Sequence, residues 1–542
     1  MCAPERAGRR QSGATKYAVR PVLLISAVAL LAVAWSADGP GDQTASTSQP
    51  AVTATVTVAT PMAAEEAGAA AYDLGAFDGR DIWIDPFNGD DADDGADRAG
   101  ALRTVDAAWR LIPSGAPLEE GYRLLLASGT YPVETSVNYW EDRHGTASAP
   151  IIIQAADGPH TARFEADINM FAVSHFALIG VDVIREGDAF HCEKCDHILL
   201  RDVELSGGTG AHETVKFNQS QHIYIENSDI HGADDNAIDF VAVQYGHVIG
   251  SRIHDAIDWC MYAKGGSAYL TFAGNEVFDC GTGGIAAGQG TGFEFMTAPW
   301  LNYEAYGIQI VNNVVHDTEG AGLGVAGGFN VMLAYNTLYS VGTRSHLVEF
   351  VHGRRGCDGA AEVCAANHDA GGWGSTEMEE ALIPNRHVYF YNNVILNPDG
   401  VQSEWQHFQI DAPLDPAASS SVPSPALADD DLRIAGNVVW NGPRDHPLGT
   451  GEGCPASNTT CNEAELLATN AINTIEPQLR DPARGDYRLT SDSTATLPAS
   501  VALPPMVWDS TPIDIPAGDA SVDVSVNAWG VDRPDGGPPG AG

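Results

Sequence analysis

Short apolar runs recur along this chain at a nearly constant interval, and this repeat restricts the possible folds more than any other feature. One residue closes each run, in the series Val183, Leu205, Ile230, Ile253, Val277, Val315, Leu338, Ile395 and Val439. Five of the eight spacings lie between 22 and 25 residues, and the other three, 38, 57 and 44 residues, fit one repeat with an inserted loop. Self-similarity at this period indicates a solenoid, in which each coil buries its apolar face only against its neighbours.

The runs are too short to be helices, because they are three to five residues long and alternate with Gly, Asn and Asp. A polar residue also recurs two positions before the closing residue, in the series Ser228, Ser251, Asn275, Asn313, Asn336, Asn393 and Asn437. Side chains stacked in this way can hydrogen-bond to their copies above and below. We therefore predict an all-β fold, a parallel β-helix that is right-handed because parallel connections favour that hand.

The ends of the chain have a different composition. Residues 1–36 have the basic, apolar and small-residue pattern of a secretory signal peptide, with an apolar block at 21–35 that is short for a membrane span. An uncleaved N-terminal anchor is the alternative. Residues 37–78 are rich in Ala, Thr, Ser and Pro and are predicted to be a disordered linker. The β-helix domain is expected at 79–535, with a flexible tail at 536–542.

Cysteine spacing and charge agree with export. Eight of the nine cysteines form close or coil-spaced pairs: Cys192/Cys195, Cys357/Cys364, Cys454/Cys461 and Cys260/Cys280. Metal ligation is compatible with these spacings, but a secreted chain favours disulfides. The 72 acidic and 28 basic residues give a net charge of −44, which disfavours nucleic acid or an anionic membrane as partner. We expect a monomer that is extracellular or periplasmic, and a polyanionic substrate only if cations screen it.

The first part of the domain carries a family resemblance. A strand is followed by the turn NGDDADDG, by a short helix at Thr104–Ile112 that can cover the open first coil, and by the strand LLLASGTYP. This order resembles the opening of secreted right-handed β-helix proteins of the pectin lyase-like superfamily, many of which are polysaccharide lyases. The segments DYRLT at 486–490 and GVDRP at 530–534 are similar to the closing strand of that superfamily. The resemblance spans about residues 80–535 and concerns the fold, because the scaffold hosts lyases, hydrolases, epimerases and adhesins.

The acidic turn NGDDADDG is most simply a solvated turn, with a calcium-binding loop as the alternative.

Aligning the central coils predicts which polar side chains stack. Lys216, Asp239 and Ala263 fall in one column, and Phe217, Phe240 and Lys264 fall in the next. Neighbouring coils stand about 4.8 Å apart, so Lys216 and Asp239 are within reach of each other. A further column holds His231, His254, Phe278 and His316, most simply a ladder of stacked rings at a corner.

Asp234 and Asp258 fall together in another column. Stacked carboxylates are costly without a cation or a shared proton, so this column predicts a metal site or an acid–base pair. Carboxylates of a solvent-exposed turn are the alternative.

Lys264 stands in the segment YAKGGS, where two glycines leave space around it. This segment resembles the lysine motif of β-helix lyases similar to chondroitinase B and alginate lyase, in which the lysine removes the proton α to a uronate carboxylate and calcium neutralises that carboxylate. The resemblance implies Lys264 as the base. Asp239 and Lys216 are the further catalytic candidates, and Asp234 and Asp258 are the candidate calcium ligands.

The match to this family is incomplete at the other positions. Of the acidic metal ligands that precede the family's lysine, only Asp258 has a counterpart, and the family's arginine would fall near Gln289. A structural lysine bound to a neighbouring coil is therefore the alternative for Lys264.

Three insertions, at about 289–306, 342–386 and 400–430, leave the repeat after the central coils. Inserted loops gather on one face of a solenoid, and this face is often the binding face. Aromatic and basic residues of these loops are predicted to bind substrate: Trp300, Tyr303, Arg354, Arg355, Trp373 and Trp405. Packing of the aromatic rings against their own loops is the alternative.

The leading prediction is a secreted lyase that acts on uronate-containing polysaccharides with calcium. A glycoside hydrolase is a second hypothesis, because Gly232–Ile238 resembles the Asp-Asp segment of polygalacturonases, although the Gly-His-Gly and Arg-Ile-Lys motifs of that family are absent. A third hypothesis is a non-catalytic surface or carbohydrate-binding solenoid. A screen of neutral and uronic polysaccharides, with and without a chelator, separates the three.

Overall fold

The computed structural model describes residues 71–542 except 358, 372–380, 416–423, 444, 452, 509–517, 519–520, 535 and 542. The predicted signal peptide, most of the predicted linker and Trp373 lie outside the described residues. None of the helices within the described ranges is long and apolar enough to cross a membrane.

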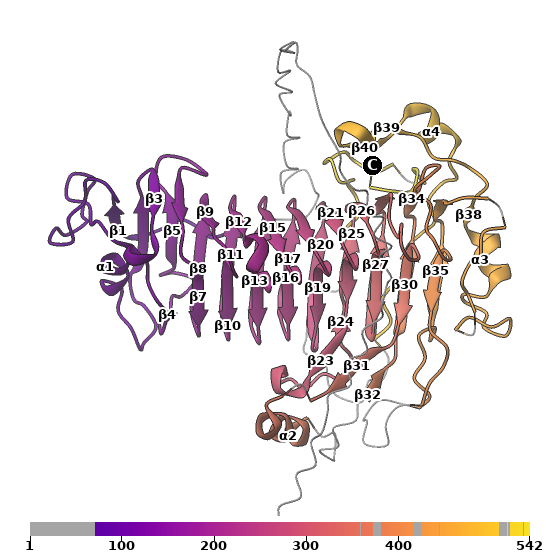
Figure 1. Cartoon of the computed structure of the whole chain (residues 1–542), viewed down its shortest axis with the longest axis horizontal. Coiled ribbons are helices and arrows are strands. Elements are labelled where there is room, and N and C mark those ends of the chain that lie inside the picture. Colours follow the sequence, from indigo (N-terminus) through magenta and orange to yellow (C-terminus); the bar gives the residue numbers. More distant parts are fainter. Residues whose placement is uncertain are drawn as a thin grey trace, which may run out of the picture. The chain divides into compact units, whose positions relative to one another are not determined.

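The described chain forms three parallel sheets whose strands follow one another coil by coil (Figure 1). The longest, sheet A, consists of β1 (Gly79–Ile84), β2 (Gly121–Leu126), β5 (Ile151–Ala155), β8 (Ser174–Ile179), β11 (Asp196–Arg201), β14 (Gln221–Glu226), β17 (Gln244–Ile249), β20 (Ser267–Ala273), β24 (Ala305–Tyr306), β25 (Gln309–Val311), β28 (Gly328–Ala334), β33 (Arg386–Tyr391) and β36 (Leu432–Ala435). Its strands are paired in parallel with those of the preceding and following coils.

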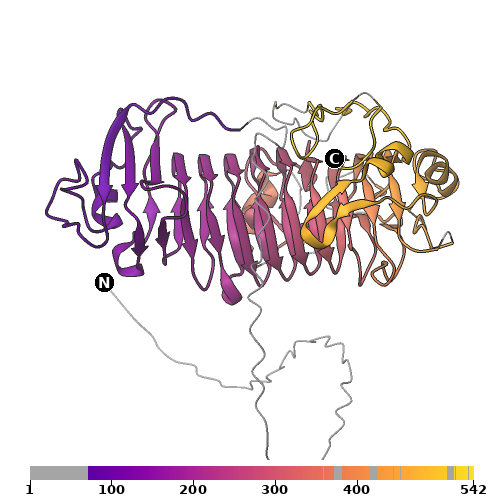
Figure 2. The same ribbon diagram turned by 90° about the horizontal axis from the view of Figure 1, so that it is seen from above.

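The other two long sheets take the remaining strands of each coil. Sheet B consists of β3 (Gly129–Tyr131), β6 (Ala162–Phe164), β9 (Val181–Ile184), β12 (Glu204–Ser206), β15 (Asp229–Ala233), β18 (Arg252–Ala256), β21 (Glu276–Cys280), β26 (Val314–Thr318), β29 (Thr337–Tyr339), β34 (Val394–Leu396), β37 (Val438–Trp440) and β38 (Ala471–Ile472). Sheet C consists of β4 (Trp140–Glu141), β7 (Ile168–Phe171), β10 (Phe190–Glu193), β13 (Glu213–Asn218), β16 (Asn236–Val241), β19 (Trp259–Lys264), β22 (Gly283–Ala287), β27 (Ala321–Ala326), β30 (Val348–Val351) and β35 (Phe408–Ile410). The predicted parallel β-helix is confirmed, as Figure 2 shows from a second direction.

The predicted register of the apolar series is confirmed. Each residue that closes a run lies opposite its copy in the next coil, from Val183 and Leu205 through to Ile395 and Val439. These side chains are fully buried and form the core together with those of sheets A and C. The series continues one coil further, because Val439 pairs with Ile472.

The predicted polar ladder is present as a buried column of hydrogen bonds. The side-chain amide of Asn275 donates to Oδ1 of Asn313 at 3.0 Å, and Asn313 donates in the same way to Asn336 at 3.0 Å. The same oxygens also accept backbone N–H groups, so each amide joins two coils. The ladder extends past Asn437 to Asn470, and it satisfies polar groups that would otherwise be buried without partners.

The helices and minor sheets lie outside the coils. They are α1 (Val105–Arg110), α2 (Ala361–Ala370), α3 (Glu463–Thr469), α4 (Ser491–Thr496), the sheet of β23 (Gly290–Gly292), β31 (Gly353–Gly356) and β32 (Ala381–Ile383), and the hairpin of β39 (Leu479–Asp481) and β40 (Asp486–Leu489). The hydroxyl of Thr104 caps α1, the predicted first helix. The segment DYRLT is not a closing strand of the solenoid, because β40 pairs only with β39, in an antiparallel hairpin.

All four predicted cysteine pairs form disulfides: Cys192–Cys195, Cys260–Cys280, Cys357–Cys364 and Cys454–Cys461. Four disulfides are typical of proteins that fold in an oxidising compartment outside the cytoplasm.

Two of the predicted columns are wrong by one residue. Asp239 lies opposite Tyr262 rather than Ala263, and Lys264 lies opposite Val241. The offset of 23 residues between Ile230 and Ile253 continues through β16 and β19, because the corner between the two strands has the same length in both coils.

The same offset changes the acidic column. The backbone N–H of Asp258 donates to the carbonyl of Asp235 at 3.0 Å, whereas Asp234 precedes this position and is exposed. The carboxylate stacked with Asp258 is therefore that of Asp235, not that of Asp234.

Candidate active site

A cavity of about 350 Å³ opens on the outer face of sheet C. The three predicted catalytic residues, Lys216, Asp239 and Lys264, line it together. The remaining lining residues are His212, Glu213, Asn218, Asp235, Val241, Tyr262, Gly290, Thr291, Gly292 and Phe295. Convergent charged groups in a concave site are typical of a binding or catalytic centre.

Strand alternation accounts for this grouping. Phe217, Phe240 and Ala263 are fully buried in the core, so their neighbours in sequence point outward. Lys216 and Asp239 stand opposite each other on β13 and β16, and Tyr262 follows on β19. The stacking of three coils thus brings a lysine, a carboxyl group and a phenol side by side.

Asp239 is the most deeply buried charged group of the cavity, with only 1% of its surface exposed. Its Oδ2 lies 2.9 Å from Nζ of Lys216, and its Oδ1 has no hydrogen-bond partner among the described residues. Burial raises the pKa of Asp239, although Lys264 and Lys216 partly oppose this rise. Asp239 is therefore a carboxyl group that keeps a proton more readily than an exposed aspartate.

Lys216 is held between two carboxyl groups. Besides Asp239, it forms an ion pair with Glu213, its neighbour on β13. Burial alone would lower the pKa of Lys216, but the charges of Asp239 and Glu213 outweigh burial and raise it. Burial likewise opposes ionisation of Glu213, yet Lys216 and His212 hold the pKa of Glu213 below its usual value. Asp239 and Glu213, on either side of Lys216, therefore have pKa values shifted in opposite directions.

Lys264 has a different environment from Lys216. Its Nζ donates to the hydroxyl of Tyr262 and to Oε1 of Gln289, both at 2.9 Å. No carboxylate of the described residues lies within 4.0 Å of its ammonium group. Burial raises the pKa of Tyr262 well above its usual value, so the phenol stays protonated. Lys264 thus presents a cation, bound only by neutral oxygens, to the cavity.

The rim of the cavity contains the groups that could hold a divalent cation. His212 Nδ1 lies 2.7 Å from Glu213, His212 Nε2 lies 3.4 Å from Asp235, and the three ligand atoms lie within 4.8 Å of one another. Burial and the nearby charge of Asp258 raise the pKa of Asp235, so a cation here would relieve the repulsion between the two carboxylates. His212, Glu213 and Asp235 could therefore hold a divalent cation, whereas Asp234 is not part of this group and Asp258 acts on Asp235 through its charge.

Some of the predicted substrate-binding residues are buried in the structure, and others are exposed. Tyr303 and Arg355 are wrong as surface contacts, because they are 3% and 0% exposed and pack inside the loops. Arg355 forms a buried ion pair with Glu304 and donates to the carbonyl of Leu301 at 2.8 Å. The burial of both residues secures the first two insertions to each other.

The other loop residues stay predictions. Arg354 is exposed on β31, paired with Gly290 of the cavity rim. Trp300 is half-buried in the first insertion, and Trp405, 54% exposed, lies beside β35 at the far end of sheet C.

The predicted site residues do not include His212, Glu213 or Tyr262, and they include Asp235 only within the segment Gly232–Ile238 of the hydrolase hypothesis. A strict offset of 23 residues would have placed Asp235 against Asp258 and Tyr262 against Asp239. His212 and Glu213 precede Lys216 at the start of the same strand, and a charged pair in that position was the available signal.

Residues 188–356 match the family described as "Right handed beta helix region", and this match contains every residue of the cavity. The match agrees with the parallel β-helix that the three long sheets form. No curated protein matches the chain significantly.

Similar solved structures include a rhamnogalacturonan lyase, with 13% identity, a TM-score of 0.46 and coverage of 77% of this chain and 98% of that chain. The pectate lyase Pel9A has 14% identity, a TM-score of 0.34 and coverage of 62% and 80%. The GH136 lacto-N-biosidase from Eubacterium ramulus has 10% identity, a TM-score of 0.41 and coverage of 73% and 68%. At this distance, the likenesses carry no argument about activity.

Proposed function

We propose that the cavity on sheet C is the active site of a polysaccharide lyase that cleaves uronate-containing glycans by β-elimination. The observation that supports this proposal is the pairing of Lys264 with Tyr262 at 2.9 Å, beside Lys216 and Asp239. A β-elimination needs a base at C5 of the uronate, positive charge near its carboxylate and a proton for the leaving oxygen. The cavity contains a group for each of these tasks.

In the proposed reaction, Lys264 takes the proton from C5. The C4–O bond then breaks, its electron pair leaves with the oxygen, and the electrons of the C5–H bond form the C4=C5 double bond. The hydroxyl of Tyr262 is protonated before the reaction because its pKa is raised, and it then supplies the proton to the leaving oxygen.

Lys216 and Asp239 prepare the site. The ion pairs of Lys216 with Asp239 and Glu213 hold its ammonium group in place at the base of the cavity, within a chain whose net charge is −44. A divalent cation, when bound at the rim, supplies further positive charge for the uronate carboxylate. Asp235, Glu213 and His212 would hold that ion, with Asp258 next to them, and calcium is the ion we propose first.

A glycoside hydrolase is the second candidate, and the opposed pKa shifts of two carboxyl groups favour it. Asp239 has a raised pKa and suits a general acid, whereas Glu213 has a lowered pKa and suits a general base or nucleophile. In this alternative Lys264 binds substrate and takes no proton.

The test is a panel of neutral and uronic polysaccharides incubated with the purified protein, with and without a chelator. A lyase releases chains whose unsaturated ends absorb in the ultraviolet, whereas a hydrolase releases reducing ends without that absorption. Lys264→Gln should abolish the ultraviolet signal, and Lys194→Gln, at an exposed lysine near sheet C, should leave it unchanged. New reducing ends without ultraviolet absorption would replace the lyase proposal with the hydrolase. If no glycan yields a product, both enzyme hypotheses fail and the non-catalytic binding solenoid remains.

A further inference from the structure

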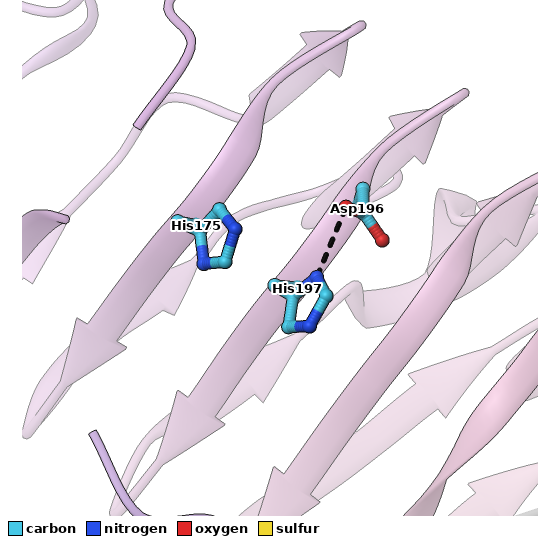
Figure 3. A group of neighbouring side chains, drawn as sticks. All are labelled: His175, Asp196 and His197. Carbon is cyan, nitrogen blue, oxygen red and sulfur yellow. Dashed lines mark ion pairs between the residues drawn. The ribbon is translucent and has the colours of Figure 1, made fainter. Parts of the chain in front are cut away.

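A second group of ionisable side chains lies on sheet A, away from the strands that form the cavity. We call it the histidine cluster and define it as His175 on β8, Asp196 and His197 on β11, and His222 on β14 (Figure 3 shows the first three). The ring centroids are 4.3 Å apart between His175 and His197 and 4.1 Å apart between His197 and His222. Three consecutive coils therefore bring three imidazoles and one carboxylate together.

The backbone builds this stack. His175, His197 and His222 are each the second residue of their strand, with φ values of 47°, 56° and 55°. Positive φ is uncommon for residues other than glycine, and here it recurs in register, so the three rings leave the sheet in the same direction. The cluster is thus a repeated feature of the fold rather than a chance contact of flexible side chains.

One polar atom of the cluster is left without a partner, and a second has an ion pair but no hydrogen bond. Oδ1 of Asp196 is buried and has no hydrogen bond within the described residues. Nδ1 of His197 is also buried, and it forms an ion pair with Oδ2 of Asp196 at 3.0 Å without the alignment of a hydrogen bond. Buried polar atoms are normally paired, so a buried carboxylate oxygen without a partner beside stacked imidazoles calls for a ligand. The donor atoms of His175, Asp196 and His197 lie within 4.8 Å of one another.

A similar group on sheet B provides a contrast. His231 and His254 are also stacked, 4.8 Å apart, with Asp255 beside them. There, however, His254 Nε2 lies 2.8 Å from Asp229 and His254 Nδ1 lies 2.8 Å from Asp255, so both ring nitrogens are bound to carboxylates. The sheet B pair is complete without a metal, whereas the histidine cluster is not.

We propose that the histidine cluster is a binding site for a late first-row divalent metal, with Zn²⁺ as the first choice. Two or three imidazole nitrogens and one carboxylate form a donor set that suits Zn²⁺ and its neighbours and not Ca²⁺, which prefers oxygen. Bonds of about 2.0–2.1 Å require the donor atoms to approach one another, so the imidazoles turn out of their stack when the metal binds. His175, His197 and Asp196 are the ligands, and His222 is placed to be the fourth.

A bound metal would connect three successive coils, and it should therefore stabilise the folded chain.

The experiment is a Zn²⁺ titration of the metal-stripped full chain by calorimetry, with thermal unfolding as a second readout. We expect wild type to bind one equivalent that is lost, or weakened at least tenfold, in His197→Ala and Asp196→Asn. The control variants His231→Ala, in the sheet B pair, and Asp235→Asn, at the cavity rim, should keep that equivalent. Zn²⁺ should raise the unfolding temperature of wild type and of both controls, and not that of His197→Ala.

His175→Gln provides a milder variant should His197→Ala not fold, and it should weaken Zn²⁺ in the same direction. Co²⁺ in place of Zn²⁺ should give visible absorption bands that disappear with Asp196→Asn, which reports ligation directly. The proposal is overturned if wild type binds no Zn²⁺, or if His197→Ala and His175→Gln bind it as tightly as wild type. Loss of the same equivalent in His231→Ala would also overturn it.

Discussion

Lys216 and Asp239 face each other from neighbouring strands of sheet C, with Nζ 2.9 Å from Oδ2, and the carboxyl group is almost completely buried. This contact joins two coils and forms the floor of the cavity. A buried ion pair adds little net stability, but loss of one partner leaves the other uncompensated.

Lys216→Met should therefore destabilise the protein in a pH-dependent way. The pKa of Asp239 is already raised in the folded state, and loss of Lys216 raises it further. Because the pKa of Asp239 is higher in the folded state, its protonated form stabilises the folded state below the unfolded-state pKa, which is near 4. This stabilisation is lost as the pH rises through the folded-state pKa. The deficit relative to wild type should be small at pH 4 and should grow towards roughly 3–5 kcal/mol at pH 8. Urea unfolding at several pH values measures it, and a deficit independent of pH would contradict the assignment.

Lys264→Gln should reduce turnover on the productive glycan by about 10²- to 10⁴-fold, the usual contribution of a general base. Its unfolding temperature should stay close to that of wild type, because Lys264 has only neutral hydrogen-bond partners. Steady-state kinetics measure the loss of turnover, and a thermal melt measures the unfolding temperature. A variant that unfolds early and keeps its activity would show that Lys264 is a structural tie between coils.

Arg355→Met should be far more damaging than Arg354→Met. Arg355 is fully buried and paired with Glu304, so its loss leaves an uncompensated charge inside the loops, at a cost of about 3–5 kcal/mol. Arg354, its exposed neighbour, should change stability by less than about 0.5 kcal/mol. Chemical denaturation of the two variants gives the comparison, and equal effects would argue against a structural role for Arg355.

Asn313→Ala should break the buried ladder in its middle. The substitution removes the oxygen that accepts both the side-chain amide and the backbone N–H of Asn275, and each unsatisfied donor costs about 1–3 kcal/mol. The matched control is Asn88→Ala, at an exposed turn outside the ladder, which should cost about 0.5 kcal/mol. Urea unfolding distinguishes them, and a loss at Asn313 no larger than that at Asn88 would be incompatible with the ladder as a stabilising element.

The solenoid could be predicted because its coils repeat. A side chain such as Ile253 has to match Ile230 and Val277 in the coils on either side, so the same residue type recurs and its spacing is visible in the chain. The ladder at Asn275 and Asn313 could be predicted from the same repetition. The four cysteine pairs could be predicted from their close or coil-length spacings. These features depend on local or nearest-neighbour contacts.

The composition of the cavity could be predicted only in part. Lys216, Asp239 and Lys264 meet there as the sequence indicated, but the carboxylate beside Asp258 is Asp235 and the group opposite Asp239 is Tyr262. A strand turns alternate residues to opposite faces, so an error of one residue in the alignment exchanges a core side chain for a cavity side chain.

The sequence by itself determined the right-handed parallel β-helix, its register at the apolar corner and the residues that carry charge on its central coils. Only the tertiary structure decided which loop residues are exposed and which ring nitrogens are left unpaired. Arg355 and Glu304 are 51 residues apart, and Arg355 is buried because two insertions pack together. His197 and His254 each have an aspartate next to them in sequence, yet both ring nitrogens of His254 hydrogen-bond to carboxylates, whereas Nδ1 of His197 has only an ion pair with Asp196. The loop contact joins segments with no repeat between them, and the histidine contacts depend on side-chain orientation, so no periodicity in the chain records either.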